Sequence, residues 1–71
     1  MDILILRTNI NSRDDFHSVK NSLNLSHKIN DCTIDLEDVD RVVRVIGENI
    51  EKDYVVKEIS RLGFNCEELQ E

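Results

Sequence analysis

The chain has 71 residues, of which 39% are apolar and 34% are charged, and its formal net charge is -6. This length predicts one small domain, 1–71. The acidic balance argues against nucleic acid or an anionic membrane surface as the main partner, because both attract clustered Lys and Arg. No apolar run approaches the ~20 residues of a membrane span, and no signal-peptide pattern opens the chain, so we expect a cytoplasmic protein.

The first 28 residues predict a strand followed by a helix. Residues 3–6 form a continuous apolar run, as in a central strand. Ser12 is a predicted helix N-cap, and the two acids that follow it favour the positive end of the helix dipole. The helix then carries one apolar stripe, formed by Phe16, Val19 and Leu23.

Polar and apolar side chains alternate over residues 31–36, which predicts a half-buried strand. Its apolar side consists of Cys32, Ile34 and Leu36. The acidic residues 37–40 then predict a hairpin loop.

The remaining third predicts a strand, a helix and a short last strand. Residues 42–46 are typical of a second central strand, which residues 47–49 break. A helix is expected over residues 50–62, with Gly63 suited to the left-handed position after it. Phe64 and Cys66 begin the last strand. The apolar residues at helical spacing are Val55, Val56, Ile59 and Leu62.

This order of elements predicts an α+β, ferredoxin-like βαββαβ fold. Right-handed crossovers place both helices on one face of a four-stranded antiparallel sheet. The predicted core comprises Leu4, Leu6, Phe16, Val19, Leu23, Ile34, Leu36, Val43, Val45, Val56, Ile59 and Phe64.

Three short runs carry a family resemblance: Val-x-x-Ser-Leu from Val19, Ile-Asp-Leu from Ile34, and Leu-Gly-Phe from Leu62. Their order and spacing resemble those of heavy-metal-associated domains, the small copper-chaperone-like modules. The corresponding patterns of that family are Val-x-x-Ala-Leu, Val-Asp-Leu, and a Gly followed by Tyr or Phe. The resemblance covers most of the chain and implies the sheet order 4-1-3-2.

The metal loop of that family, Met-x-Cys-x-x-Cys before the first helix, is not reproduced. If Ile10 takes the place of the Met, then Ser12 and Asp15 take the places of the two cysteines. Copper(I) and Zn²⁺ prefer thiolate or imidazole ligands. We therefore predict no metal site, no cofactor and no catalytic residue.

Several polar residues near this loop have both a functional and a structural interpretation. Ser12, Asp14 and Asp15 could bind a hard cation such as Mg²⁺ or Ca²⁺, but helix capping is the interpretation that we adopt. His17 and His27 could be ligands, yet they do not form a spaced pair on one element. We interpret both as surface side chains.

The two cysteines, Cys32 and Cys66, share strand parity with core residues and are interpreted as small buried apolar groups. Their strands lie at opposite sheet edges in the order 4-1-3-2, so we expect no disulfide or shared metal within one molecule. The acids Glu37, Asp38 and Asp40 are interpreted as a solvated hairpin rather than a cation or partner site. Enzyme activity is not predicted, because no nucleophile or phosphate-loop motif is present.

The first functional hypothesis is a non-catalytic interaction or accessory module that has lost the cysteine metal site. The alternative is a metal-handling, copper-chaperone-like protein with non-standard or inter-subunit ligands, and a third is a small-molecule regulatory domain. For the first hypothesis we expect a protein partner or a homodimer through the sheet face away from the helices. That face would be lined by Ile3, Ile5, Val42, Arg44 and Ile46.

Overall fold

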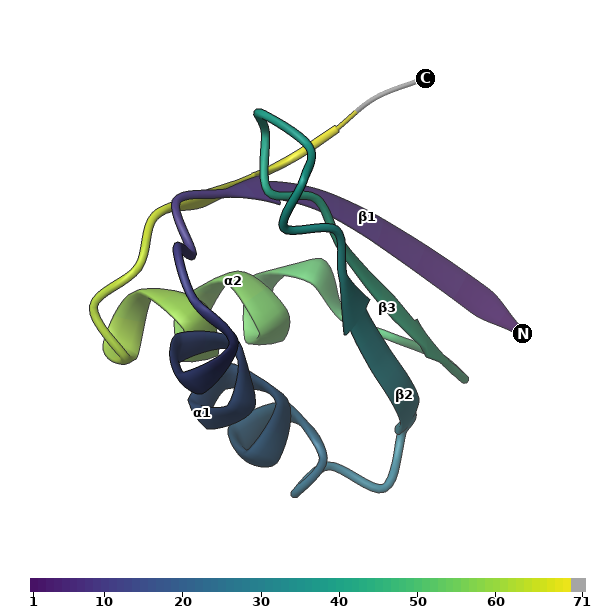
Figure 1. Cartoon of the computed structure of the whole chain (residues 1–71). Helices are drawn as coiled ribbons and strands as arrows, with labels where there is room; N and C mark the ends of the chain where they lie inside the picture. The colour runs from purple at the N-terminus through teal and green to yellow at the C-terminus, as the bar shows by residue number, and fades with distance from the viewer. Residues whose placement is uncertain (70–71) are drawn as a thin grey trace.

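Two helices pack on one face of a four-stranded antiparallel sheet (Figure 1). The computed structural model describes residues 1–69, so the predicted domain 1–71 extends two residues beyond the described part. The elements are β1 (Asp2–Thr8), α1 (Arg13–Leu23), β2 (Ile29–Ile34), β3 (Val43–Gly47), α2 (Lys52–Arg61) and β4 (Cys66–Glu68). The strands lie in the order β2-β3-β1-β4, which confirms the predicted fold class and sheet order. None of the described helices is long and apolar enough to cross a membrane.

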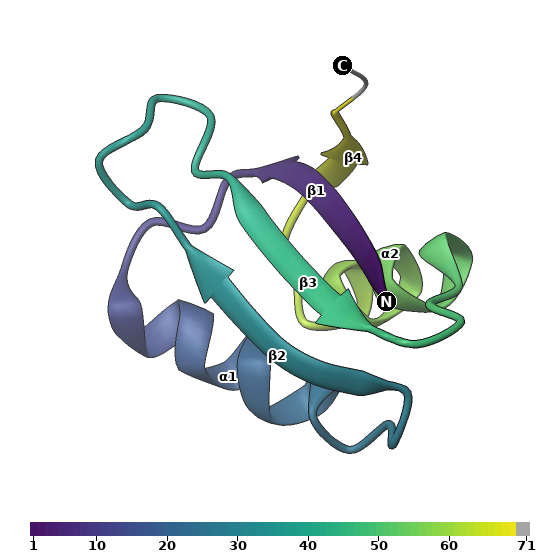
Figure 2. The same ribbon diagram turned by 90° about the vertical axis from the view of Figure 1, so that its right-hand side faces the viewer.

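The central strands β1 and β3 decide which side chains face the helices. Figure 2 looks onto the sheet, with both helices behind it. Leu4 lies opposite Val45, and Leu6 lies opposite Val43. All four side chains are buried. Because side chains alternate along a strand, the intervening residues of both strands lie on the open face.

Helix α1 begins as its sequence predicts. The Ser12 hydroxyl accepts a hydrogen bond from the Asp15 N–H at 3.1 Å and so caps the first turn. The predicted stripe of Phe16, Val19 and Leu23 is buried against the sheet. Local capping and one apolar stripe therefore account for this helix.

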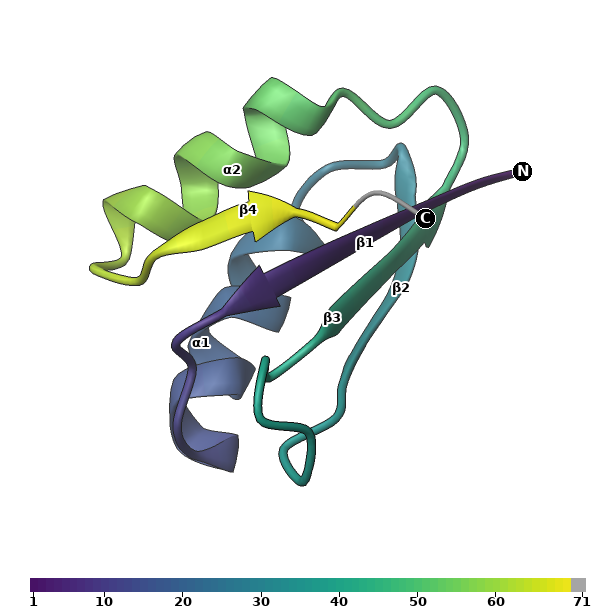
Figure 3. The same cartoon turned by 90° about the horizontal axis from the view of Figure 1, so that it is seen from above.

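Helix α2 ends in the left-handed turn that the sequence predicts at Gly63, whose φ is 98°. The Gly63 N–H donates to the Ser60 carbonyl at 3.0 Å, and the Phe64 N–H donates to the Ile59 carbonyl at 3.2 Å. This pair of bonds is the Schellman arrangement. It turns the chain back toward the sheet, where β4 lies beside β1 (Figure 3).

Three predictions about the second half of the chain are wrong in detail. Val55 is fully buried, whereas Val56 is only half-buried and packs at the border of the core. Helix α2 is shorter than the predicted 50–62. Phe64 was expected to begin the last strand, but it precedes β4 and packs half-buried against the core.

The predicted strand over residues 31–36 is shifted toward the N-terminus. It begins at Ile29, which is buried, and ends at Ile34, which packs half-buried against the core. Leu36 was predicted in the core but lies half-buried in the loop. The reason is that the Asp35 N–H donates to the Val42 carbonyl at 2.9 Å, which closes the hairpin before Leu36.

Strand β2 forms one edge of the sheet and is irregular. A register shift separates Ile29 from Asp31 in the pairing with β3. The Asp31 carboxylate accepts from the Cys32 N–H at 2.8 Å and lies 3.5 Å from the Lys20 ammonium. An edge with a bulge and charged side chains is a poor template for another strand.

Gly47 stands where two backbones almost touch. It was predicted to break β3, but it is the last residue of that strand. A Cβ at this position would lie 2.0 Å from the Lys28 carbonyl oxygen. The Glu48 N–H donates to that same oxygen at 2.9 Å. The turn between α1 and β2 is therefore fixed against the end of β3.

Gly47→Ala is expected to lower the free energy of unfolding by about 3 kcal/mol, because backbone atoms must move to accept the methyl group. Gly63→Ala is the control, since a Cβ there meets nothing within 4 Å and only the left-handed backbone costs roughly 1–2 kcal/mol. Urea unfolding of both variants measures the difference. A loss at Gly47 no larger than at Gly63 would contradict the close approach.

Cys32 belongs to the core, as predicted, and its side chain has no exposed surface. Burial raises the pKa of its thiol from the ordinary value of 9.0 to about 11, because an apolar environment disfavours the thiolate. The thiol is therefore protonated at neutral pH and acts as a small apolar group.

Stability should fall as the pH rises from about 9 to about 11. In this range the unfolded chain releases the Cys32 proton while the folded chain retains it, so unfolding is favoured by up to roughly 2–3 kcal/mol. The contribution of the thiol is fully present below this range. Cys32→Ala lacks the group, so its urea-unfolding series should decline less with pH. Parallel curves for the two chains would contradict the prediction.

Candidate functional site

The segment that the sequence resemblance set against the metal loop of heavy-metal-associated domains joins β1 to α1. Its apolar residue, Ile10, is fully buried, and the Ile10 N–H donates to the Thr8 hydroxyl at 3.2 Å. Sequence reasoning placed Ile10 in this loop but omitted it from the core, although an apolar residue in a polar stretch was a usable signal. Ser12 and Asp15, which the sequence resemblance set against the two cysteines, adjoin each other through the capping hydrogen bond.

The other candidate ligands near this loop are few. Asp14 and His17 are exposed, and Asp15 is half-buried in the first turn of α1. His27 is exposed in the turn that follows the far end of the helix. Across residues 1–69, no three His, Cys, Asp or Glu side chains are grouped so that they could hold a metal ion.

An arginine that sequence reasoning did not single out connects this loop to the hairpin between β2 and β3. Arg41 has a positive φ of 46°. Its guanidinium donates to the Leu36 carbonyl and, at 3.4 Å, to the Asn11 side chain. Its own carbonyl accepts from the Thr8 hydroxyl at 2.8 Å. The polar groups around the loop therefore serve to hold two neighbouring turns together.

The acids of the hairpin are engaged by groups of the same chain. The Arg7 guanidinium lies 2.7 Å from a carboxylate oxygen of Asp40 and 3.1 Å from one of Glu67. Hydrogen bonds to Asp40 and to Glu67 raise the pKa of the Arg7 guanidinium. The Asp38 carboxylate accepts from the Asp40 N–H at 2.8 Å and shapes the turn, whereas Glu37 is exposed. This arrangement agrees with a structural hairpin rather than a free acidic site.

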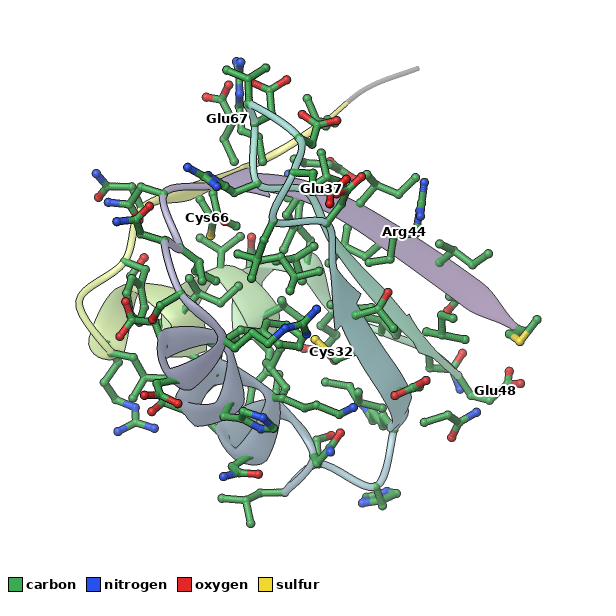
Figure 4. All side chains as sticks on the ribbon, in the orientation of Figure 1. Cys32, Glu37, Arg44, Glu48, Cys66 and Glu67 are labelled. Atoms are coloured by element: carbon green, nitrogen blue, oxygen red, sulfur yellow. The ribbon has the colours of Figure 1, made fainter. Side chains whose placement is uncertain are left out.

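The second thiol, Cys66, lies opposite Thr8 at the loop end of the sheet. It is half-buried, and burial raises the pKa of this thiol as well. Cys32 and Cys66 are both free, on opposite edge strands. Figure 4 labels both and shows them apart, on the helix side of the sheet. Protonated thiols on separate strands are poor metal ligands and poor nucleophiles.

A hollow of about 300 Å³ lies beside the loop, between the end of β1 and the start of β4. The Arg7 guanidinium, which lines this hollow, is already paired with carboxylates. The Cys66 thiol, which also lines it, is protonated at neutral pH. These groups offer hydrogen bonds and charge but no activated nucleophile. The lining residues are Arg7, Thr8, Asn9, Asn65, Cys66 and Glu67.

No protein-family model matches the sequence, and no curated protein matches it significantly. Solved structures share its fold. The yeast copper transporter domain Ccc2a is 23% identical over 96% of this chain and 94% of that chain, with a TM-score of 0.83. A copper-binding domain from HMA7, a P-type ATPase, is 16% identical over 99% and 96% of the two chains, with a TM-score of 0.83. The N-terminal domain of PacS from Synechocystis is 10% identical over 99% and 100%, with a TM-score of 0.81.

At identities this low, the likeness concerns the path of the backbone and not the ligands of a site. It nevertheless extends over nearly the whole of each chain. These domains and this chain thus share one arrangement of four strands and two helices. The chain therefore has the fold of the heavy-metal-associated domains, as the order of its short sequence motifs predicted.

Proposed function

We propose that this domain is a non-catalytic interaction or accessory module that has the heavy-metal-associated-like fold without a thiolate metal site. The observation that carries the proposal is the bond between the Ser12 hydroxyl and the Asp15 N–H. If Ile10 takes the place of the family's Met, this helix cap occupies the two positions at which the family has its cysteines. Copper(I) prefers thiolate to a hydroxyl or a carboxylate.

The alternative is a metal-handling protein with non-standard or inter-subunit ligands. It is favoured by the descriptions of the structural neighbours as copper-binding or copper transporter domains. Against it, Cys32 and Cys66 lie on opposite edge strands, and burial raises the pKa of both thiols. A site built from these thiols would need a second molecule or a rearranged fold.

The class of partner follows from charge. A net charge of -6 supports a protein partner rather than nucleic acid or an anionic membrane surface. We infer a cytoplasmic location for this module. The face of the sheet away from the helices is the surface that we assign to contacts with a protein partner, either a different protein or a second copy of this chain.

A copper(I) competition titration tests the absence of a thiolate site. The native chain should lose copper(I) to a soluble chelator, whereas the double variant Ser12→Cys/Asp15→Cys should retain it on the order of 100-fold better, because two thiolates are restored at the family spacing. The matched control is Lys57→Cys/Ser60→Cys, which places two cysteines at the same spacing on exposed positions of α2. This control should gain far less.

A native chain that retains copper(I) against the chelator would contradict the proposal and support the metal-handling alternative. A double variant that gains no more than the α2 control would show that the loop is not aligned with the family's metal loop.

Ser12→Ala should lower the free energy of unfolding by about 1 kcal/mol, the usual cost of losing an N-cap hydroxyl. Ser18→Ala is the control, because Ser18 is exposed within the same helix. Thermal or urea unfolding measures both. Equal stability of the two variants would mean that the Ser12 hydroxyl is not retained as a cap.

A further inference from the structure

We propose that the open face of the sheet binds a second copy of this chain, in an antiparallel contact centred on Ile46. In this contact Arg44 of each copy pairs with Glu48 of the other. The inference rests on the proposed function, because an accessory module acts through contacts with proteins.

The open face carries an apolar strip across its two central strands. Ile3 lies opposite Ile46, and Ile5 lies opposite Arg44. Ile3 is 58% exposed, while Ile5, Val42 and Ile46 are half-buried. Ile3, Ile5, Arg44 and Ile46 therefore lie on the open face, as predicted, whereas Val42 directly precedes β3. A contiguous apolar strip on an uncovered sheet face is typical of a contact surface.

Arg44 stands within this strip as a cation available to a partner. Its side chain is exposed. The ion pairs found within residues 1–69 do not include it. The neighbouring Arg7, by contrast, is held by two carboxylates of its own chain. An arginine amid apolar side chains favours a partner that presents a carboxylate at the same place.

The open face of a second copy presents such a carboxylate, that of Glu48. The outward positions along β3 and just beyond it are Arg44, Ile46 and Glu48, a cation, an apolar residue and an anion two residues apart. Figure 4 shows Arg44 and Glu48 on the same side of the sheet, away from the helices. A twofold axis at Ile46 reverses this order in the second copy. Each Arg44 then meets Glu48 of the second copy, and the two Ile46 side chains meet each other.

Glu48 remains available for this contact. Its side chain is 66% exposed, and its partner within residues 1–69 is the Met1 amino group at 3.4 Å. An exposed ion pair of this kind contributes little stability. Breaking that pair to form one with Arg44 of a second copy therefore costs little.

The size of the face sets the strength of the contact. Four strands about 4.8 Å apart and about five residues long cover roughly 300 Å², which is less than the ~800 Å² per partner of a standard interface. Two chains that each carry a charge of -6 also repel each other. We therefore expect a weak dimer with a dissociation constant on the order of 0.1–1 mM.

Sedimentation equilibrium and amide NMR shifts, measured from about 10 µM to about 2 mM under reducing conditions, span this range of dissociation constants. Arg44→Glu and Glu48→Arg should each weaken the dimer at least about tenfold, because each places like charges together. The double variant Arg44→Glu/Glu48→Arg should restore it, since it rebuilds both pairs in reverse at the native net charge. Lys57→Glu is the control for Arg44→Glu, because it makes the same change of charge at an exposed position on α2. It should leave the dissociation constant nearly unchanged.

A native chain that stays monomeric throughout overturns the proposal and leaves the face to a different protein. So does a charge-swapped variant that stays monomeric while the native chain dimerises. Repeating the series with a metal chelator distinguishes a failure of the proposed function from a failure of the proposed dimer. A dimer that dissociates on chelation is bridged by metal and counts against the proposed function as well, whereas a monomeric, metal-free native chain counts against this inference alone.

Discussion

The pairing of β1 with β3 is the interaction on which the rest of the domain depends. Residues 3–6 are apolar at every position, so β1 alone does not decide which of its sides faces the helices. Strand β3 decides it, because Arg44 lies between Val43 and Val45 and cannot be buried without a partner. The observed register puts both valines against leucines of β1. A slip by one residue would exchange the covered and open faces of the sheet.

Features determined by neighbouring residues were predictable from the sequence, and features determined by distant ones were not. The Ser12 cap and the left-handed Gly63 each depend on a single turn of chain, and both were predicted. Val55 and Val56 fit a helical stripe with Ile59 almost equally well, so the choice between them depends on how α2 lies on the sheet. The need for Gly47 comes from a carbonyl nineteen positions earlier in the chain, and no local pattern indicates it.

The candidate site likewise has some features that neighbouring residues determine and others that distant residues determine. That the loop before α1 lacks thiols is evident from the sequence, and so is its capacity to cap a helix. The contacts that hold the loop in place come instead from a different turn, through Arg41 and the Thr8 hydroxyl. Arg41 has the backbone conformation usually taken by glycine, and nothing in its immediate sequence indicates this. Prediction of the site was therefore limited by contacts between segments thirty or more residues apart.

The irregular edge at β2 has a consequence for assembly. The Asp31 carboxylate already occupies one backbone N–H of that strand, and the opposite edge, β4, is only three residues long. Growth of the sheet by addition of further strands is thus discouraged at both ends. The open-face contact that we propose would, in contrast, close on itself after two copies. The two edges of the sheet therefore oppose the strand-by-strand addition from which fibrils grow.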